Sequence, residues 1–94
     1  MTKEIIPYGK IATPAEFGGI ARRRRRESGA TQTKIAGLSG VGIRFLSELE
    51  RGKPTIELGK ALKVLQRLGL DIWIMPRGVS RKATPFPEDR EHTA

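Results

Sequence analysis

Cysteine is absent from this sequence of 94 residues, and histidine occurs once, at His92. Without cysteine the chain has no disulfide bond, no thiolate nucleophile and no cysteine-ligated zinc or iron–sulfur site. A single histidine excludes a histidine cage for a metal ion and argues against a histidine general base. A glycine-rich phosphate-binding loop is missing as well. These absences predict a protein that is not an enzyme and that holds no metal ion or other cofactor.

Long apolar runs are also missing, because the longest spans a few residues whereas a membrane-spanning helix needs about 20. Residues 1–10 contain no apolar core of a signal peptide. We therefore expect a cytoplasmic protein. Acidic residues are the scarcer charge: 10 Asp and Glu stand against 18 Lys and Arg, a net charge of +8. Such an excess favours nucleic acid as the partner. An anionic membrane is disfavoured, because the apolar helix faces are needed for a core.

The length allows one small domain. We expect an N-terminal extension at residues 1–13, a folded helical domain at 14–69, a short strand at 70–76 and a tail at 77–94. The tail combines prolines and mixed charges with a single large apolar residue, Phe86. Such a segment cannot bury enough surface to offset its ordering entropy, so we expect it to be disordered.

The first two helices of the folded domain are predicted from their capping residues. Thr13 and Glu16 have the spacing of a capping box, and Pro14 between them suits the first position of a helix. Thr31 is the predicted cap of a second, short helix. Gly40 then provides the tight turn that leads to a third helix.

The third and fourth helices are predicted from hydrophobic spacing. The third spans about residues 42–51, and the fourth is expected to begin at a Thr55 cap and to end at Gly69. The apolar positions of the fourth helix recur at helical spacing and comprise Leu58, Ala61, Leu62, Leu65 and Leu68. This helix is therefore amphipathic, with one face toward a core.

The second and third helices together have the pattern of a helix-turn-helix. Ala36 supplies the small side chain that a close helix crossing needs, and Gly40 supplies the turn. Val41, Leu46 and Leu49 are spaced to pack the second helix of the pair onto the rest of the domain. In this motif the second helix enters the major groove of DNA with its N-terminus first.

Residues 14–69 resemble the lambda-repressor-like domain of the Cro/C1 (XRE) regulators, through the segment TQTKIAGLSGVGIRFLSELERGK. The segment FLSELERGKPTIELGKALKVLQRLGLDIWI is most similar to HipB-type antitoxins. This resemblance implies an all-α fold, a compact four-helix domain followed by one short C-terminal β-strand that pairs between two protomers. It also implies a homodimeric repressor that binds a palindromic operator in double-stranded DNA, regulates its own operon and binds a HipA-like kinase toxin.

The resemblance and the exposed helix face together predict the residues that contact DNA: Thr31, Gln32, Gly42, Ile43, Arg44, Ser47, Glu48, Arg51 and Lys53. Arg44 suits a guanine edge or a phosphate, and Ile43 suits a thymine methyl group or partial burial against the second helix. Glu48 either accepts a hydrogen bond from cytosine or lies on a solvated surface. The resemblance further implies a buried ion pair between Arg25 and Glu50.

Two features leave alternatives open. Arg22, Arg23, Arg24 and Arg26 either clamp a phosphate backbone or form a solvated basic face. The predicted strand would form the dimer interface through Leu70, Ile72, Trp73, Ile74 and Met75, and alternation places Leu70, Ile72 and Ile74 toward the helices. Trp73 either belongs to this interface or covers the core beneath the fourth helix within one monomer. Other functions compatible with the sequence are a standalone XRE-type regulator without a toxin and a protein-interaction inhibitor that does not depend on DNA.

Overall fold

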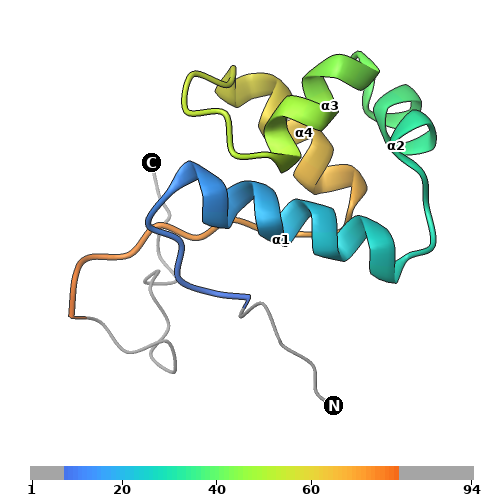
Figure 1. Cartoon of the computed structure of the whole chain (residues 1–94). Coiled ribbons are helices and arrows are strands. Elements are labelled where there is room, and N and C mark those ends of the chain that lie inside the picture. The colour runs from blue at the N-terminus through green and yellow to red at the C-terminus, as the bar shows by residue number, and fades with distance from the viewer. Residues whose placement is uncertain (1–7, 79–94) are drawn as a thin grey trace, which may run out of the picture.

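The computed structural model describes residues 8–78, which form four helices. They are α1 (Pro14–Glu27), α2 (Gln32–Ser39), α3 (Ile43–Glu50) and α4 (Leu58–Arg67). The helix α1 packs against α3, and α2 packs against both α3 and α4. In Figure 1, α1 lies below the other three helices. The predicted four-helix, all-α architecture is confirmed. Residues 70–76 form no strand within the described chain, so the strand and its pairing between protomers stay a prediction.

The start of α1 follows from the predicted capping box. The Thr13 hydroxyl accepts a hydrogen bond from the backbone N–H of Glu16 at 3.1 Å, and the Glu16 carboxylate accepts one from the N–H of Thr13 at 3.1 Å. One turn further on, Gly18 is buried where α1 meets the end of α3. A Cβ added to Gly18 would overlap the carbonyl oxygen of Leu49 and lie 3.0 Å from that of Glu50. The α1–α3 packing therefore depends on a bare backbone at this position.

The turn between α2 and α3 also forms as predicted. Thr31 caps α2 by accepting a hydrogen bond from the N–H of Lys34 at 3.1 Å. Gly40 ends α2 in the left-handed conformation, with a φ of 71° that favours glycine. Ala36 is 1% exposed at the helix crossing. This short turn fixes the direction of α3 relative to α2.

The prediction that Thr55 caps α4 is wrong. The helix begins at Leu58, and the carboxylate of Glu57 caps it by accepting a hydrogen bond from the N–H of Gly59 at 3.0 Å. Thr55 lies in a turn, and Ile56 packs against the core before the helix starts. Packing of the partly buried Ile56 therefore accompanies a helix start two residues later than the threonine cap predicts.

The core lies where the four helices meet. Its largest fully buried side chains are those of Leu46, Leu49 and Val64. Among the described residues, the buried hydrophobic cluster contains Ala21, Ile35, Ala36, Leu46, Leu49, Ala61, Val64, Leu65 and Leu68. The core thus takes its residues from all four helices and their ends, which holds α3 against the rest of the domain from both sides.

After α4 the chain runs in the direction opposite to α1 (Figure 1). Leu70 packs partly against the core, but residues 71–74 are exposed. Ile72 is 43% exposed, Trp73 55% and Ile74 84%. The prediction that Ile72 and Ile74 face the helices is therefore wrong within one protomer. The predicted N-terminal extension is described only from residue 8, and most of the predicted tail lies outside the described residues.

Candidate nucleic-acid interface

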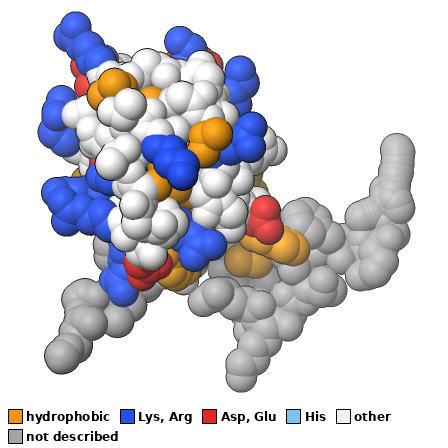
Figure 2. Space-filling model, turned by 90° about the vertical axis from the view of Figure 1, so that its right-hand side faces the viewer, with side chains coloured by type: hydrophobic (Ala, Val, Ile, Leu, Met, Phe, Trp, Pro, Cys, Tyr) orange, Lys and Arg blue, Asp and Glu red, His pale blue; other side chains and the backbone are white. Residues whose placement is uncertain are grey.

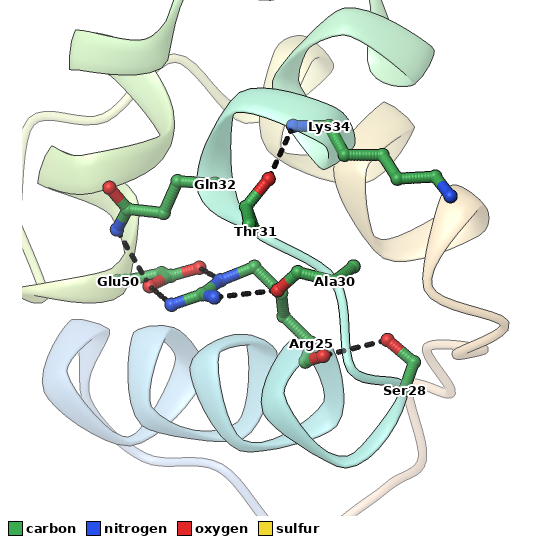
Figure 3. A network of polar contacts seen from close by, with 7 residues as sticks. All are labelled: Arg25, Ser28, Ala30, Thr31, Gln32, Lys34 and Glu50. Carbon is green, nitrogen blue, oxygen red and sulfur yellow. Dashed lines mark hydrogen bonds and ion pairs between the residues drawn. The ribbon is translucent and has the colours of Figure 1, made fainter.

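A buried polar network anchors the C-terminal end of α3 to α1 and α2 (Figure 3). Arg25 and Glu50 form the expected ion pair, with Nε of Arg25 donating to Oε2 of Glu50 at 2.6 Å and Nη2 donating to Oε1 at 2.9 Å. Nη1 of Arg25 donates to the carbonyl of Ala30 at 2.9 Å. The amide of Gln32 donates to Oε1 of Glu50 at 2.9 Å. One guanidinium group and one carboxylate thus connect three helices.

The charges in this network stabilise one another. Burial raises the pKa of the Glu50 carboxyl, but the hydrogen bonds from Arg25 and Gln32 outweigh it, so the pKa lies below its ordinary value. The hydrogen bond to Glu50 raises the pKa of Arg25, against the effect of burial. Both groups are therefore ionised at neutral pH. Gln32 was predicted to contact DNA, but its side-chain amide donates to Glu50 and so supports the end of α3.

The accessible stripe along α3 and its C-cap contains four of the predicted DNA-contacting residues at helical spacing: Arg44, Ser47 and Glu48 of the helix and Arg51 at the cap. Nη1 of Arg51 donates to the hydroxyl of Ser47 at 2.7 Å. Glu48 pairs with Nε of Arg44 at 3.3 Å and with Nζ of Lys53 at 3.2 Å. The Arg44 side chain remains 91% exposed. The stripe therefore presents the N–H groups of its arginines to a ligand, and contacts with Ser47 and Glu48 orient these arginines.

Sequence reasoning left the role of Glu48 open and missed its two ion pairs. The hydrogen bond from Lys53 lowers the pKa of Glu48, and Arg44 adds to this effect against desolvation. The four-residue spacing of Arg44 and Glu48 was the available signal, since side chains at this separation meet on a helix surface. Glu48 keeps two cations ordered on the exposed side of α3.

The N-terminal end of α3 is open. Gly42 precedes the helix without a side-chain cap, and a Cβ at this position would meet nothing within 4 Å. Ile43, the first residue of α3, is 49% exposed. A helix that begins with a bare backbone and an accessible aliphatic side chain allows close approach of another molecule to its N–H groups.

A concavity of about 400 Å³ lies where α1, α2 and α3 meet, beside the exposed stripe of α3. The side chains that line it are Arg22, Arg25, Arg26, Gln32, Ser47, Glu50 and Arg51. Sequence reasoning did not place Arg22 and Arg26 at this site, because the packing of α1 decides which arginines point there. On the α2 side of the molecule, seen in Figure 2, Lys and Arg clearly outnumber Asp and Glu.

Two further findings concern the described residues alone. Between residues 8 and 78, no group of three or more His, Cys, Asp or Glu side chains is arranged to hold a metal ion. Over the same range, every helix is too short or too polar to cross a membrane.

Comparisons with known proteins place this geometry in a family. A family described as Helix-turn-helix matches residues 20–72. The chain is 48% identical over 73 residues to the uncharacterized HTH-type transcriptional regulator y4mF of Sinorhizobium fredii (strain NBRC 101917 / NGR234), covering 78% of this chain and 96% of that protein.

Solved structures share the fold. A HipB-O1-O2 complex is similar with a TM-score of 0.68 at 25% identity, covering 73% of this chain and 100% of that chain. The restriction-modification controller protein C.AhdI from Aeromonas hydrophila is similar with a TM-score of 0.56 at 29% identity, covering 62% of this chain and 84% of that one. Because the matched segment makes up more than half of the chain, this protein belongs to the XRE-type helix-turn-helix family of transcriptional regulators.

Proposed function

We propose that this protein is a sequence-specific DNA-binding repressor that reads the major groove with α3. The observation that carries the proposal is the combination of an exposed, donor-rich face on α3 with the rigid support of that helix by Arg25, Gln32 and Glu50. Base readout needs side chains whose positions are fixed by a scaffold, and α3 is held from two sides. The family relationship to HTH-type regulators supports this function.

The predicted contacts divide into two roles. Ile43 and Arg44 lie at the open end of α3 and Ser47 lies one turn further along, and these three would read base edges. Arg51 and Lys53 follow the helix, where phosphates would be held. Gly42 would let the DNA backbone approach the start of α3. Thr31 lies exposed at the start of α2, where a phosphate would meet backbone N–H groups.

Binding to duplex DNA at several salt concentrations tests the proposal. A repressor that neutralises phosphates shows a steep decrease of affinity with salt, and its selected operator should be a palindrome with half-sites about one helical turn apart. Footprinting of sites selected from a random pool would reveal this spacing. Absence of any salt-dependent binding to duplex DNA would contradict the proposal and favour a protein-interaction module.

Replacing Arg44 with Ala should weaken binding to the selected operator by about 1–3 kcal/mol if Arg44 contacts a base edge. The variant should bind a random-sequence duplex almost as well as the wild type does, because a contact to a base edge adds affinity only where the matching base is present. Equal losses on both duplexes would assign Arg44 to phosphate instead. Lys63→Ala, on the exposed side of α4, is the control for the loss of one positive charge.

We infer that the protein acts as a homodimer joined by antiparallel pairing of residues 70–75. Within one protomer Ile72 is 43% exposed and Ile74 84% exposed, and an exposed apolar segment of this kind can associate with a second copy. Two copies related by a two-fold axis would cover it and would present two α3 helices to a palindrome.

Substituting Ile74 with Lys should convert the dimer into monomers and weaken operator binding, while the helices stay folded because Ile74 is 84% exposed in the protomer. Sedimentation velocity and circular dichroism would measure both effects. Leu58→Lys is the control, since Leu58 is exposed on α4, 60% accessible. Should Leu58→Lys be monomeric and Ile74→Lys dimeric, α4 would replace the strand as the interface.

The finer proposal is that the protein is the antitoxin of a HipBA-like module and binds a HipA-like kinase. The sequence resemblance to HipB-type antitoxins and the fold shared with a HipB-O1-O2 complex support it. A kinase encoded beside this gene, co-expressed without a tag, should co-purify with the tagged protein. DNA binding without such a partner would favour a standalone regulator.

A further inference from the structure

The structure separates the five consecutive arginines of α1 into two groups. Arg25 pairs with Glu50, and Nε of Arg24 donates to the carbonyl of Leu68 at 2.7 Å. Nε of Arg23 pairs with Glu27 at 2.9 Å, and the same carboxylate accepts a hydrogen bond from Tyr8 at 2.8 Å. Arg24 and Arg25 thus hold α1 to other parts of the domain, whereas Arg23 pairs with a residue of α1 itself. All three side chains are engaged in contacts within the domain.

Arg22 and Arg26 form the second group. They lie four residues apart on one side of α1, and both line the concavity between α1, α2 and α3. Within residues 8–78, neither side chain makes a hydrogen bond or an ion pair. Arg51 lines the same concavity and uses Nη1 for Ser47, which leaves its other N–H groups for a ligand.

Among residues 8–78, Glu50 is the one acidic residue that lines this concavity, and its carboxylate already has hydrogen-bond partners. Glu50 accepts three hydrogen bonds, two from Arg25 and one from Gln32, so it offers little to Arg22, Arg26 or Arg51. The positive charge of Arg22, which lines the same concavity, makes the smallest contribution to lowering the pKa of Glu50, after those of Arg25 and Gln32. Three guanidinium groups thus share a concave site without a carboxylate of their own.

We propose that this concavity is a phosphoryl-binding pocket, formed by Arg22 and Arg26 of α1 with Arg51 after α3, and that it takes a phosphate of the DNA backbone. Guanidinium groups bind phosphate oxygens in bidentate fashion, and three of them converge on one concave surface. We assign the bound phosphate to DNA because Ser47 and Arg51 line the pocket and also belong to the exposed stripe along α3 and its C-cap. A duplex seated on α3 would therefore bring one strand over the pocket.

This inference rests on the proposed DNA-binding function and adds α1 to the interface. The test compares the double variant Arg22→Gln/Arg26→Gln with the control Lys10→Gln/Lys63→Gln, which removes the same charge from exposed lysines outside the pocket. Anisotropy of a labelled random-sequence duplex, measured over a salt series, gives the slope of log affinity against log salt. Each lost phosphate contact reduces this slope by about 0.9, so the Arg22/Arg26 variant should lose about one to two units.

The control should keep the wild-type slope within error. An unchanged slope in the arginine variant, or an equal loss in the control, would overturn the pocket while leaving the proposed function intact. Failure of the wild type itself to bind duplex DNA would instead refute the proposed function. Circular dichroism verifies folding, and Arg22→Lys/Arg26→Lys should keep the slope while weakening binding, because lysine preserves charge without bidentate geometry.

A second arm distinguishes a backbone phosphate from free phosphate. Thermal melting is recorded with and without inorganic phosphate, at matched ionic strength. We expect no pocket-dependent protection. If inorganic phosphate stabilised the wild type, did not stabilise the arginine variant, and the DNA slopes were equal, the pocket would be a site for a free phosphorylated ligand and the DNA assignment would be wrong.

Discussion

Replacing Gly18 with Ala should destabilise the fold by about 3 kcal/mol or more, an overpacking effect at the upper end of its usual range. The new methyl group would overlap the carbonyl oxygen of Leu49 and lie 3.0 Å from that of Glu50. Both are backbone atoms of α3 and cannot rotate away. Relief of the overlap would need α1 and α3 to separate, which would disrupt the Arg25–Glu50 ion pair as well.

Gly19 provides a matched control one residue further along α1. A Cβ at Gly19 meets nothing within 4 Å, so Gly19→Ala should stabilise the protein by about 0.5–1 kcal/mol through helix propensity. Chemical denaturation of both variants measures the difference in the free energy of unfolding. Equal stabilisation by the two substitutions would show that α1 and α3 are not in backbone contact at Gly18.

The sequence predicts the parts of this fold that depend on local chemistry. The capping box at Thr13, the cap at Thr31 and the left-handed turn at Gly40 are all properties of a few neighbouring residues, and all three form. The predicted start of α4 was wrong because it was based on local capping alone. In the structure Ile56 packs against core residues contributed by distant parts of the chain, and the helix begins after Glu57 rather than after Thr55.

The candidate site was predictable where the motif spacing specifies it. The resemblance gives the stripe on α3 and the pairing of Arg25 with Glu50 directly. It does not say which of five consecutive arginines face the concavity, since that depends on the rotation of α1 against α3. The exposure of Ile72 and Ile74 was not predicted either. Strand alternation separates side chains into two faces, but it does not say which face packs against the helices of the same protomer.

Removing the buried carboxylate with Glu50→Ala should cost about 3–5 kcal/mol of stability, because Arg25 would be left as an uncompensated buried charge. Arg25 is 9% exposed and Glu50 7% exposed, so water cannot replace the missing partner easily. The substitution would also release Gln32 from its hydrogen bond at the start of α2. We therefore expect weaker DNA binding even where the variant remains folded. The double variant Arg25→Met/Glu50→Leu is the control, since replacing both charges together should recover much of the stability.

The pH dependence of stability separates this charge effect from lost packing. The pKa of Glu50 is lower in the folded protein than in the unfolded chain, so the ion pair contributes fully above the unfolded value of about 4.3. Its contribution then decreases as the pH falls through the lower folded pKa, where the carboxylate takes up a proton.

Glu50→Gln keeps the shape of the side chain and removes this titration. The stability difference between the wild type and Glu50→Gln should therefore be constant near neutral pH and narrow in acid. A difference that stayed constant down to the acid end would mean that the charge on Glu50 contributes nothing, and that Gln32 and packing alone position α3.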